Sequence, residues 1–443
     1  MAELAPRSRT AGRLLLAAVG LGFGLRAAAA VAVDRVGRGK GRLCLFDDTE
    51  IYWQLAGAIR RGAPFAVEQW GLPHFALRTP GYPLFLAACQ WAFGMRTLPV
   101  RLVQAALGAA CVAMVFRLVL VARVGADRGW GVAATASVLV AIDPFSVGIS
   151  ALILSEGVFM PLMVASLWGL ATLWRAPGEA PGRSRAAVAL ATGALSGAAI
   201  LVKPSWALFI PAALTAWVAT AKGRRGGAIR GSAAVLLGLA IAMAPWWARN
   251  AGVYGRFVPT ALWLGASLYD GLNPGATGAS DMAFLDAPDL RALDETAQDA
   301  ELRDRALRFA AGHPVAVARL ASVKLSRYWS PWPNAESFRS PRVAIASAVA
   351  ALPAFGLMLV GAWDRRRDAR ALVLLGGPVL YFAAVHMAFV SSIRYRIPGA
   401  LPALGLAAIG AGRLRVKFFG LDPRRGRCDI GSEGGPGSGS SGA

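Results

Sequence analysis

Residues 99–122, PVRLVQAALGAACVAMVFRLVLVA, and residues 155–174, SEGVFMPLMVASLWGLATLW, are two predominantly apolar stretches of about 20 residues, the length of helix that crosses a bilayer. Similar blocks recur along the chain and predict about ten transmembrane helices. The predicted spans are residues 12–33, 99–122, 130–147, 155–174, 187–202, 205–221, 231–248, 343–362, 371–390 and 398–414. The predicted fold class is therefore an all-α polytopic membrane protein.

The distribution of charge predicts the topology. The 443 residues are 56% hydrophobic, and a net charge of +22 would also suit a nucleic-acid-binding protein. The cations, however, cluster at every second gap between apolar blocks, as in the cytoplasmic loops of membrane proteins. The clusters are Arg117 and Arg123; Arg175, Arg183 and Arg185; Lys222, Arg224 and Arg225; and Arg365, Arg366 and Arg367. We expect both termini in the cytoplasm and no nucleic-acid partner. Residues 12–33 resemble a signal peptide but are long enough to stay as the first span.

The predicted organisation has four parts. Residues 1–248 form an N-terminal transmembrane module whose first external loop is 34–98, and 249–342 form an external helical segment. Residues 343–414 are C-terminal transmembrane helices, and 415–443 are a flexible, Gly/Ser-rich cytoplasmic tail.

Several segments outside the spans have helical patterns of their own. Residues 80–94 are short and open with prolines, so we expect an interfacial or re-entrant helix rather than a span. Ile51, Leu55 and Ile59 are at helical spacing and predict an amphipathic helix lying on the membrane surface. In the late external segment, helices are expected near 292–311 and 314–328.

Carboxylates at two predicted external positions are the first candidate site residues. Asp47, Asp48 and Glu50 follow the first span, where a carboxylate could accept a proton or hold a divalent ion. Asp48 could equally cap the next helix. Glu156 is at the outer end of the fourth span. Burying an ionisable group there costs desolvation free energy, so Glu156 is a candidate for a functional residue. It could also simply face headgroup water.

Five cations are expected on the same external side, where positive charge is disfavoured: Arg78, Lys203, Arg249, Arg394 and Arg396. Guanidinium and ammonium groups gathered in one place favour a bound phosphate. The alternatives are anionic lipid headgroups, or pairing of these cations with Asp48 and Glu156.

The order of these motifs resembles that of the GT-C superfamily of membrane glycosyltransferases. The similarity is to bacterial relatives of protein O-mannosyltransferases and of the aminoarabinose transferase that acts on lipid A. The segments that carry it are FDDTEIYWQLAGAIRRG, RTPGYPLFLA, LILSEGVFMPL, LVKPSWALF, APWWARNAGVYGRFVPT, LNPGATG and RYRIPGALPALGLAA. Each is weak alone, and together they are specific for the superfamily but not for the substrate.

The resemblance implies a hexosyl or pentosyl transferase in the cell inner (plasma) membrane with an extracytoplasmic active site. The donor would be a polyprenyl-phosphate sugar, and the acceptor a lipid, a glycan or a protein. No nucleotide or other cofactor is required, and a role for a divalent metal ion stays open.

The resemblance also implies residue roles. Asp48, four residues before Tyr52, would be the base; Thr49 replaces the family's second acid, so Asp47 or Glu50 could substitute for it. Glu156 would orient the sugar or the acceptor. The donor phosphate would be bound by Arg249, Arg394 and Arg396, with support from Lys203, Arg78 and Tyr395.

Two other classes of protein fit part of the pattern. A transporter would place ionisable groups near the membrane midplane and often has inverted repeats, and neither is evident here. A flippase-like protein that handles lipid-linked sugars would also use external cations, but it has no need of Asp48.

Overall fold

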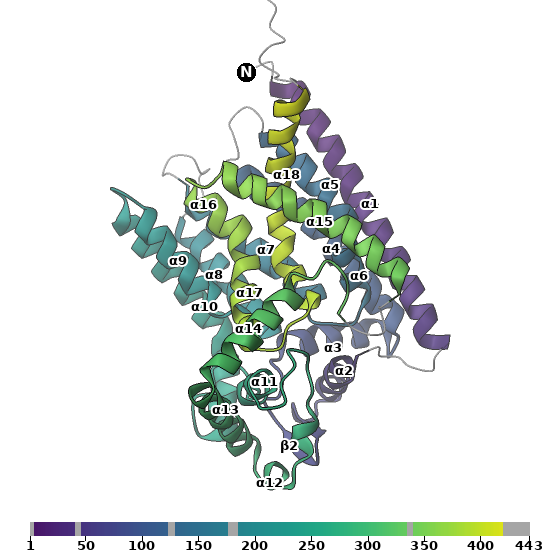
Figure 1. Cartoon of the computed structure of the whole chain (residues 1–443), viewed down its shortest axis with the longest axis vertical. Coiled ribbons are helices and arrows are strands. Elements are labelled where there is room, and N and C mark those ends of the chain that lie inside the picture. The colour runs from purple at the N-terminus through teal and green to yellow at the C-terminus, as the bar shows by residue number, and fades with distance from the viewer. Residues whose placement is uncertain (1–3, 40–45, 123–128, 176–184, 335–339, 420–443) are drawn as a thin grey trace, which may run out of the picture.

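The computed structural model describes residues 4–39, 46–122, 129–175, 185–334 and 340–419, which fold almost entirely into helices (Figure 1). The helices in the first half are α1 (Leu4–Gly39), α2 (Asp47–Arg60), α3 (Gly81–Phe93), α4 (Thr97–Val121), α5 (Gly129–Ile142), α6 (Pro144–Ala151), α7 (Glu156–Leu173), α8 (Arg185–Val202), η1 (Pro204–Trp206) and α9 (Phe209–Thr220). The second half contains α10 (Arg225–Tyr254), α11 (Leu264–Gly271), η2 (Ala283–Asp286), α12 (Pro288–Arg291), α13 (Glu295–Gly312), α14 (Pro314–Tyr328), α15 (Pro341–Asp364), α16 (Ala369–Ala371), η4 (Leu372–Gly376), α17 (Gly377–Ala388) and α18 (Ile393–Phe419). The strands are β1 (Val67–Gln69) and β2 (Leu72–His74).

The all-α polytopic fold is confirmed. Eight described helices are long and apolar enough to cross a membrane, and α5 with α6 forms a ninth candidate span that bends by 49°. The apolar helix over Pro204–Thr220 corresponds to the remaining predicted span but is shorter than 18 residues. Helix α3 has 13 residues and runs beside α2 at the end of the bundle, in agreement with an interfacial helix (Figure 1).

The two ends of the bundle differ in their chemistry. The start of α1 and the end of α18 lie together at one end, and α2, α3 and α11–α13 lie at the other (Figure 1). At the first end, Arg175 Nε and Arg370 Nη2 donate to the carbonyl oxygens of Val121 and Ala122 at the end of α4. Arginines thus lie at the end that contains both termini of the described chain. We call the opposite end, which contains α2, α3 and α11–α13, the external end, after the sidedness predicted from the sequence.

Close helix contacts depend on glycines. A Cβ on Gly361 of α15 would overlap the carbonyl oxygen of Leu406 on α18, and one on Gly410 would overlap that of Leu357. Gly193 of α8 and Gly238 of α10 make the same kind of close approach to each other's helix. Small residues let helix backbones touch in a membrane, where lipid supplies no hydrophobic force between helices.

The break between α5 and α6 is supported by a buried cation. Asp143 caps α6 by accepting from the Ser146 backbone N–H at 2.7 Å. Arg26 of α1, 1% exposed, donates to the carbonyl oxygens of Val140 and Ala141 at 3.1 and 3.2 Å. Arg26 thus satisfies carbonyls at the bend, because a backbone acceptor left unpaired in hydrocarbon is costly.

The apolar face of α2 packs against protein, so the prediction that this face rests on the membrane is wrong for Ile51 and Leu55. Ile51 and Leu55 form a buried cluster with Val67 of β1 and with Leu77. The strands form a hairpin whose turn residues Trp70 and Gly71 both have positive φ, of 51° and 76°. The three-residue strands are too short to show an alternating pattern in the sequence.

The external segment forms a small helical layer beneath the bundle (Figure 1). Its core consists of Ala266, Leu285, Leu290 and Leu302. The helix predicted over 292–311 is α13, capped by Asp294, and the one predicted over 314–328 is α14.

Candidate active site at the external end of the helices

Five charged side chains form one continuous chain of ion pairs at the external end. Arg394 is central: its Nη1 donates to Asp48 Oδ2 at 3.0 Å, and its Nε donates to Glu156 Oε1 at 2.9 Å. Arg78 Nη2 donates to the other oxygen of Asp48 at 3.0 Å, and Lys203 Nζ donates to Glu156 Oε1 at 3.0 Å. We call Asp48, Arg78, Glu156, Lys203 and Arg394 the charged cluster.

The cluster joins segments that are far apart in the sequence. Asp48 is in the first turn of α2 and Glu156 is the first residue of α7, positions where the helix dipole favours a negative charge. Lys203 directly follows α8, and Arg394 is in the first turn of α18. Thr49 Oγ1 donates to the Ile153 carbonyl oxygen at 2.9 Å and so fastens α2 to the turn before Glu156.

The two carboxylates differ in exposure. The Glu156 side chain is 0% exposed, and Asp48 is 34% exposed. Burial alone would raise the pKa of Asp48, but the charges and hydrogen bonds of Arg394 and Arg78 outweigh burial and lower it. With three cations and two carboxylates, the cluster has a formal charge of +1.

Aromatic rings surround the cations. Lys203 and Arg394 lie over the Tyr395 ring at 5.5 and 5.8 Å from its centroid, and His386 stacks on the same ring at 4.1 Å. Arg78 lies over Trp263 at 4.9 Å and over Tyr52 at 6.0 Å. Burial raises the pKa of Tyr52, so its hydroxyl stays protonated at neutral pH. Tyr52 and Tyr395, predicted to support the site, therefore line it.

Two predicted phosphate-binding arginines do not reach the cluster. Arg249 donates to the carbonyl oxygens of Phe75 and Phe65 at 2.7 and 2.9 Å. Arg396, 2% exposed, donates to those of Tyr328 and Ser330 at 2.7 and 2.8 Å. Both arginines hold backbone in this structure, and their contacts give no support to a phosphate role.

Of the two remaining predicted acids, Glu50 is outside the cluster. Glu50 is exposed, and its Oε1 accepts from Gln54 Nε2 at 3.2 Å, one turn along α2. Asp47 begins α2, but its side chain lies outside the described residues. Neither residue can be assigned as a partner of Asp48 from these contacts.

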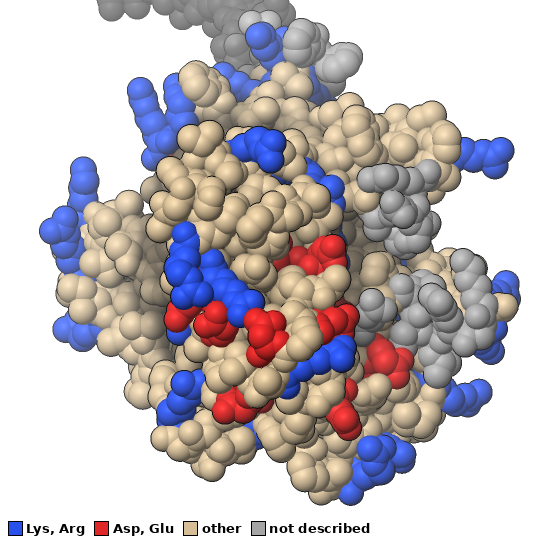
Figure 2. Space-filling view, turned by 60° about the horizontal axis from the view of Figure 1, so that its bottom comes forward, with Lys and Arg blue, Asp and Glu red and all other residues tan. Residues whose placement is uncertain are grey.

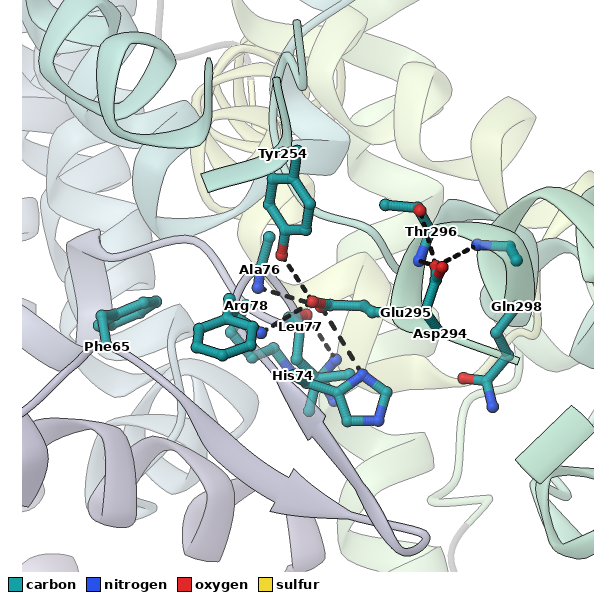
Figure 3. A network of polar contacts seen from close by, with 12 residues as sticks. Phe65, His74, Ala76, Leu77, Arg78, Tyr254, Asp294, Glu295, Thr296 and Gln298 are labelled. Atoms are coloured by element: carbon teal, nitrogen blue, oxygen red, sulfur yellow. Dashed lines mark hydrogen bonds and ion pairs between the residues drawn. The ribbon is translucent and has the colours of Figure 1, made fainter. Parts of the chain in front are cut away.

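A buried carboxylate in the external segment was not predicted. Glu295, 6% exposed, accepts from the backbone N–H groups of Phe75 and Ala76 at 2.8 and 3.0 Å and from the Tyr254 hydroxyl at 2.5 Å (Figure 3). His74 Nδ1 lies 3.6 Å from the same carboxylate. Glu295 therefore fixes the segment that leads to Arg78. In the sequence it is one of many acids after a helix cap, and no local signal marks it.

Several acids on the surface of the external segment are paired with its own arginines. Figure 2 shows acidic side chains gathered over the middle of the external face, with Lys and Arg both beside them and around the rim. Arg305 donates to Asp289 at 2.6 Å and to Glu301 at 2.7 Å. Within the described residues, no group of three or more His, Cys, Asp or Glu side chains is arranged to hold a metal ion.

Comparison with known proteins identifies the fold. The family model of dolichyl-phosphate-mannose-protein mannosyltransferase matches residues 79–248, which include Glu156 and Lys203. An oligosaccharyltransferase, AglB, from Archaeoglobus fulgidus, solved with an inhibitory peptide and a dolichol-phosphate, aligns with 92% of this chain at 12% identity and a TM-score of 0.51. An oligosaccharyltransferase from the same archaeon, solved with Zn and sulfate, aligns with 91% of the chain at 13% identity and a TM-score of 0.53.

The chain spans about half the length of these archaeal oligosaccharyltransferases, since the two alignments cover 50% and 49% of the archaeal chains. ArnT from Cupriavidus metallidurans bound to undecaprenyl phosphate aligns with 94% of this chain and 79% of its own at 16% identity, with a TM-score of 0.41. No curated protein sequence matches the chain. The resemblance seen in the motifs is confirmed, and the chain is a polytopic membrane protein with the fold of the GT-C superfamily.

Proposed function

We propose that the chain is an integral membrane glycosyltransferase that transfers a hexosyl or pentosyl group from a polyprenyl-phosphate sugar to an acceptor hydroxyl. The observation that carries this proposal is the placement of Arg394, which bridges Asp48 and Glu156 at the external end of the bundle. An anion-binding cation and a carboxylate base thus share one site. The archaeal structural neighbour solved with a dolichol-phosphate supports a donor of this class.

The donor phosphate would be held by Arg394, Lys203 and Arg78. Their side chains are 20%, 12% and 13% exposed, so each is partly buried and still reachable from water. A glycosyl phosphodiester carries one negative charge, which balances the formal charge of +1 of the charged cluster. Guanidinium groups also match the geometry of phosphate oxygens.

Asp48 is the proposed base. It would take the proton of the acceptor hydroxyl while the acceptor oxygen forms a bond to the anomeric carbon and the bond from that carbon to the phosphate oxygen breaks. The electron pair of the broken bond stays on the phosphate, beside the cations. Removing one preorganised donor of this kind costs about 3 kcal/mol of transition-state stabilisation in well-studied enzymes. A single base implies one displacement, with inversion at the anomeric carbon.

In the resting cluster Asp48 is held by two arginines and is a weak base, because its pKa is lowered. A phosphate that arrives between Arg394 and Arg78 competes for the same N–H groups. Donor binding would then loosen the pairs of Asp48 and raise its basicity beside the sugar. The base would be activated when the donor is present.

The catalytic assignment is tested by Asp48→Asn, with Glu50→Gln as the matched control two residues away. We expect Asp48→Asn to lose transfer from polyprenyl-phosphate sugars by a factor of about 100 or more, and Glu50→Gln to keep it. Wild-type transfer by Asp48→Asn would refute the assignment. If the wild type and the Asp48→Asn variant bind the donor equally well and neither transfers the sugar to any acceptor, the result would instead favour a flippase-like protein that handles lipid-linked sugars.

We place the external end outside the cytoplasm, in the cell inner (plasma) membrane, with both termini inside. Ala311 is exposed at the end of α13 and provides a site for labelling. With Cys44 and Cys428 replaced by serine, Ala311→Cys should react with an impermeant maleimide on intact cells. Labelling that requires permeabilisation would reverse the topology.

A further inference from the structure

Helix α14 is hydrogen-bonded to the turn between α17 and α18. This turn leads directly into Arg394. α14 packs against both of these helices at the external end (Figure 1). Two of its side chains donate to backbone carbonyl oxygens at this turn: Lys324 Nζ to Met387 and Ala388 at 3.3 and 2.7 Å, and Arg327 Nε to Ser391 at 3.0 Å. The Tyr328 hydroxyl donates to Val379, near the start of α17, at 2.7 Å. One helix therefore holds this turn by its backbone.

Lys324 is the most buried cation of this arrangement. Its side chain is 0% exposed, and its ammonium group also donates to the Gly271 carbonyl oxygen at the end of α11, at 2.8 Å. The three donors of the ammonium group thus bond to three carbonyls from α11 and α17. Burying a charge is expensive unless it is fully hydrogen-bonded. Because the ammonium group of Lys324 donates only to backbone carbonyls, we infer that its role is to hold that backbone in position.

The backbone beyond Ala388 stays fixed up to Arg394. The Ser391 N–H donates to the Gly278 carbonyl oxygen at 3.0 Å, and the Ile393 N–H donates to Asn334 Oδ1 at 2.7 Å. Ile393 is the first residue of α18 and directly precedes Arg394. The contacts therefore run without a gap from Lys324 to the start of the helix that carries Arg394.

We propose that Lys324 is a positioning residue of the charged cluster, which fixes the α17–α18 turn so that Arg394 reaches both Asp48 and Glu156. The role of Arg394 rests on the proposed function, but the effect of Lys324 on the turn does not. The external segment thereby acts on the site through backbone, apart from any contact with an acceptor.

The protonation state of Lys324 also depends on this burial. Burial lowers the pKa of Lys324 to about 8, against a smaller opposing effect of Asp270. The other titratable or charged groups near Lys324 are Asp270, Arg327 and His386. Asp270 of α11 accepts from Ser280 and from the Asp281 N–H. Arg327 lies on α14, as Lys324 does, and the His386 ring of α17 contacts the Val390 carbonyl oxygen. An opening of the turn that exposes Lys324 to water would restore its ordinary, higher pKa, so a rise in pH through about 8 favours the closed turn. The overall fold should not weaken from this titration, because a lysine pKa lowered by folding increases stability with rising pH.

The test is hydrogen–deuterium exchange of the whole protein in detergent, comparing Lys324→Met with Arg319→Met. Arg319 is an exposed cation on the same helix and serves as the control. Peptides that cover residues 389–396 should exchange about tenfold faster in Lys324→Met, because charge-assisted hydrogen bonds are lost, and α2 should be unchanged. Affinity for undecaprenyl phosphate should fall in the same variant. Unchanged exchange and affinity would overturn the inference.

Two further outcomes keep the test decisive. If Lys324→Met does not fold, the wild type is compared with Lys324→Gln, whose neutral amide keeps two N–H donors but loses the charge and the third donor. Protection lost specifically in residues 389–396 supports the inference, and a uniform loss or no loss overturns it. If the wild type binds no undecaprenyl phosphate, the proposed function fails, whereas faster exchange in Lys324→Met still supports the positioning of the turn.

Discussion

Replacing Glu156 by glutamine separates the stability of the charged cluster from its affinity for phosphate. Glu156 is fully buried and accepts from Arg394 Nε and Nη2 at 2.9 and 3.4 Å and from Lys203 Nζ at 3.0 Å. Glutamine keeps the shape, but its amide nitrogen cannot accept a hydrogen bond. At least one of the three contacts is lost, and two cations are left without the charge between them.

The expected cost follows from this burial. Removing one partner of a buried ion pair typically costs about 3–5 kcal/mol. Arg394 and Lys203 remain 20% and 12% exposed, and Arg394 keeps its pair with Asp48, so water and Asp48 compensate part of that loss. We expect the free energy of unfolding in detergent to fall by about 2–3 kcal/mol.

Affinity should change in the opposite sense. Glu156→Gln raises the formal charge of the cluster from +1 to +2, whereas Arg394→Gln lowers it to zero. Undecaprenyl phosphate should bind Glu156→Gln at least as tightly as the wild type, and Arg394→Gln about tenfold more weakly or worse. Both constants come from titration of purified protein. Equal loss of affinity in the two variants would refute the idea that the cations bind phosphate while Glu156 only holds them.

Two other variants test parts of the fold that support the site. Gly361→Ala should lower the free energy of unfolding by about 1–3 kcal/mol, because its Cβ would overlap the Leu406 carbonyl oxygen. Gly356→Ala on the same helix has open space around the new Cβ and should leave the free energy of unfolding unchanged. Equal thermal unfolding midpoints for the two variants would contradict this packing. The pKa of Glu295 is lowered because the nearby His74 ring and hydrogen bonds from Tyr254 and two backbone N–H groups outweigh its burial. The stabilisation that Glu295 provides is therefore lost as the pH falls below the ordinary carboxyl pKa of about 4.5. Glu295→Gln should therefore be less stable than the wild type at neutral pH, by about 1–3 kcal/mol, and should lose less stability on acidification. Glu68→Gln, an exposed change in β1, is the control. Parallel curves of unfolding free energy against pH for the wild type and Glu295→Gln would contradict the assignment.

The spans and the external cluster were predictable because their signals are local. Blocks of about 20 apolar residues predict the spans, and arginines in alternate gaps predict the sidedness, without any tertiary information. Asp48, Glu156 and Arg394 stand out because each charge borders an apolar stretch. Their pairing was one of the alternatives open in the sequence, and the structure shows it.

The functions of individual arginines were not predictable in the same way. Arg249 and Arg394 both lie beside an apolar span and both could face a phosphate, but Arg249 meets carbonyls of the first external loop. The difference depends on which distant backbone packs nearby. Glu295 and Lys324 escape prediction for the same reason, since each acts on chain more than 50 residues away.

The pairing of Asp48 in the resting cluster has a kinetic consequence that a pH profile can detect. A carboxylate base is inactive when protonated, so activity falls as the pH drops through its pKa. In the free enzyme Arg394 and Arg78 keep the pKa of Asp48 well below its ordinary value, and kcat/KM reports the free enzyme. In the donor complex the phosphate shares these cations, so the pKa of Asp48 rises and kcat should fall at a higher pH than kcat/KM. Arg78→Met, which removes one of the two cations, should move the acid limb of kcat/KM toward that of kcat. An acid limb of kcat/KM that lies above that of kcat, or that ignores Arg78→Met, would show that Asp48 is not the base held by this cluster.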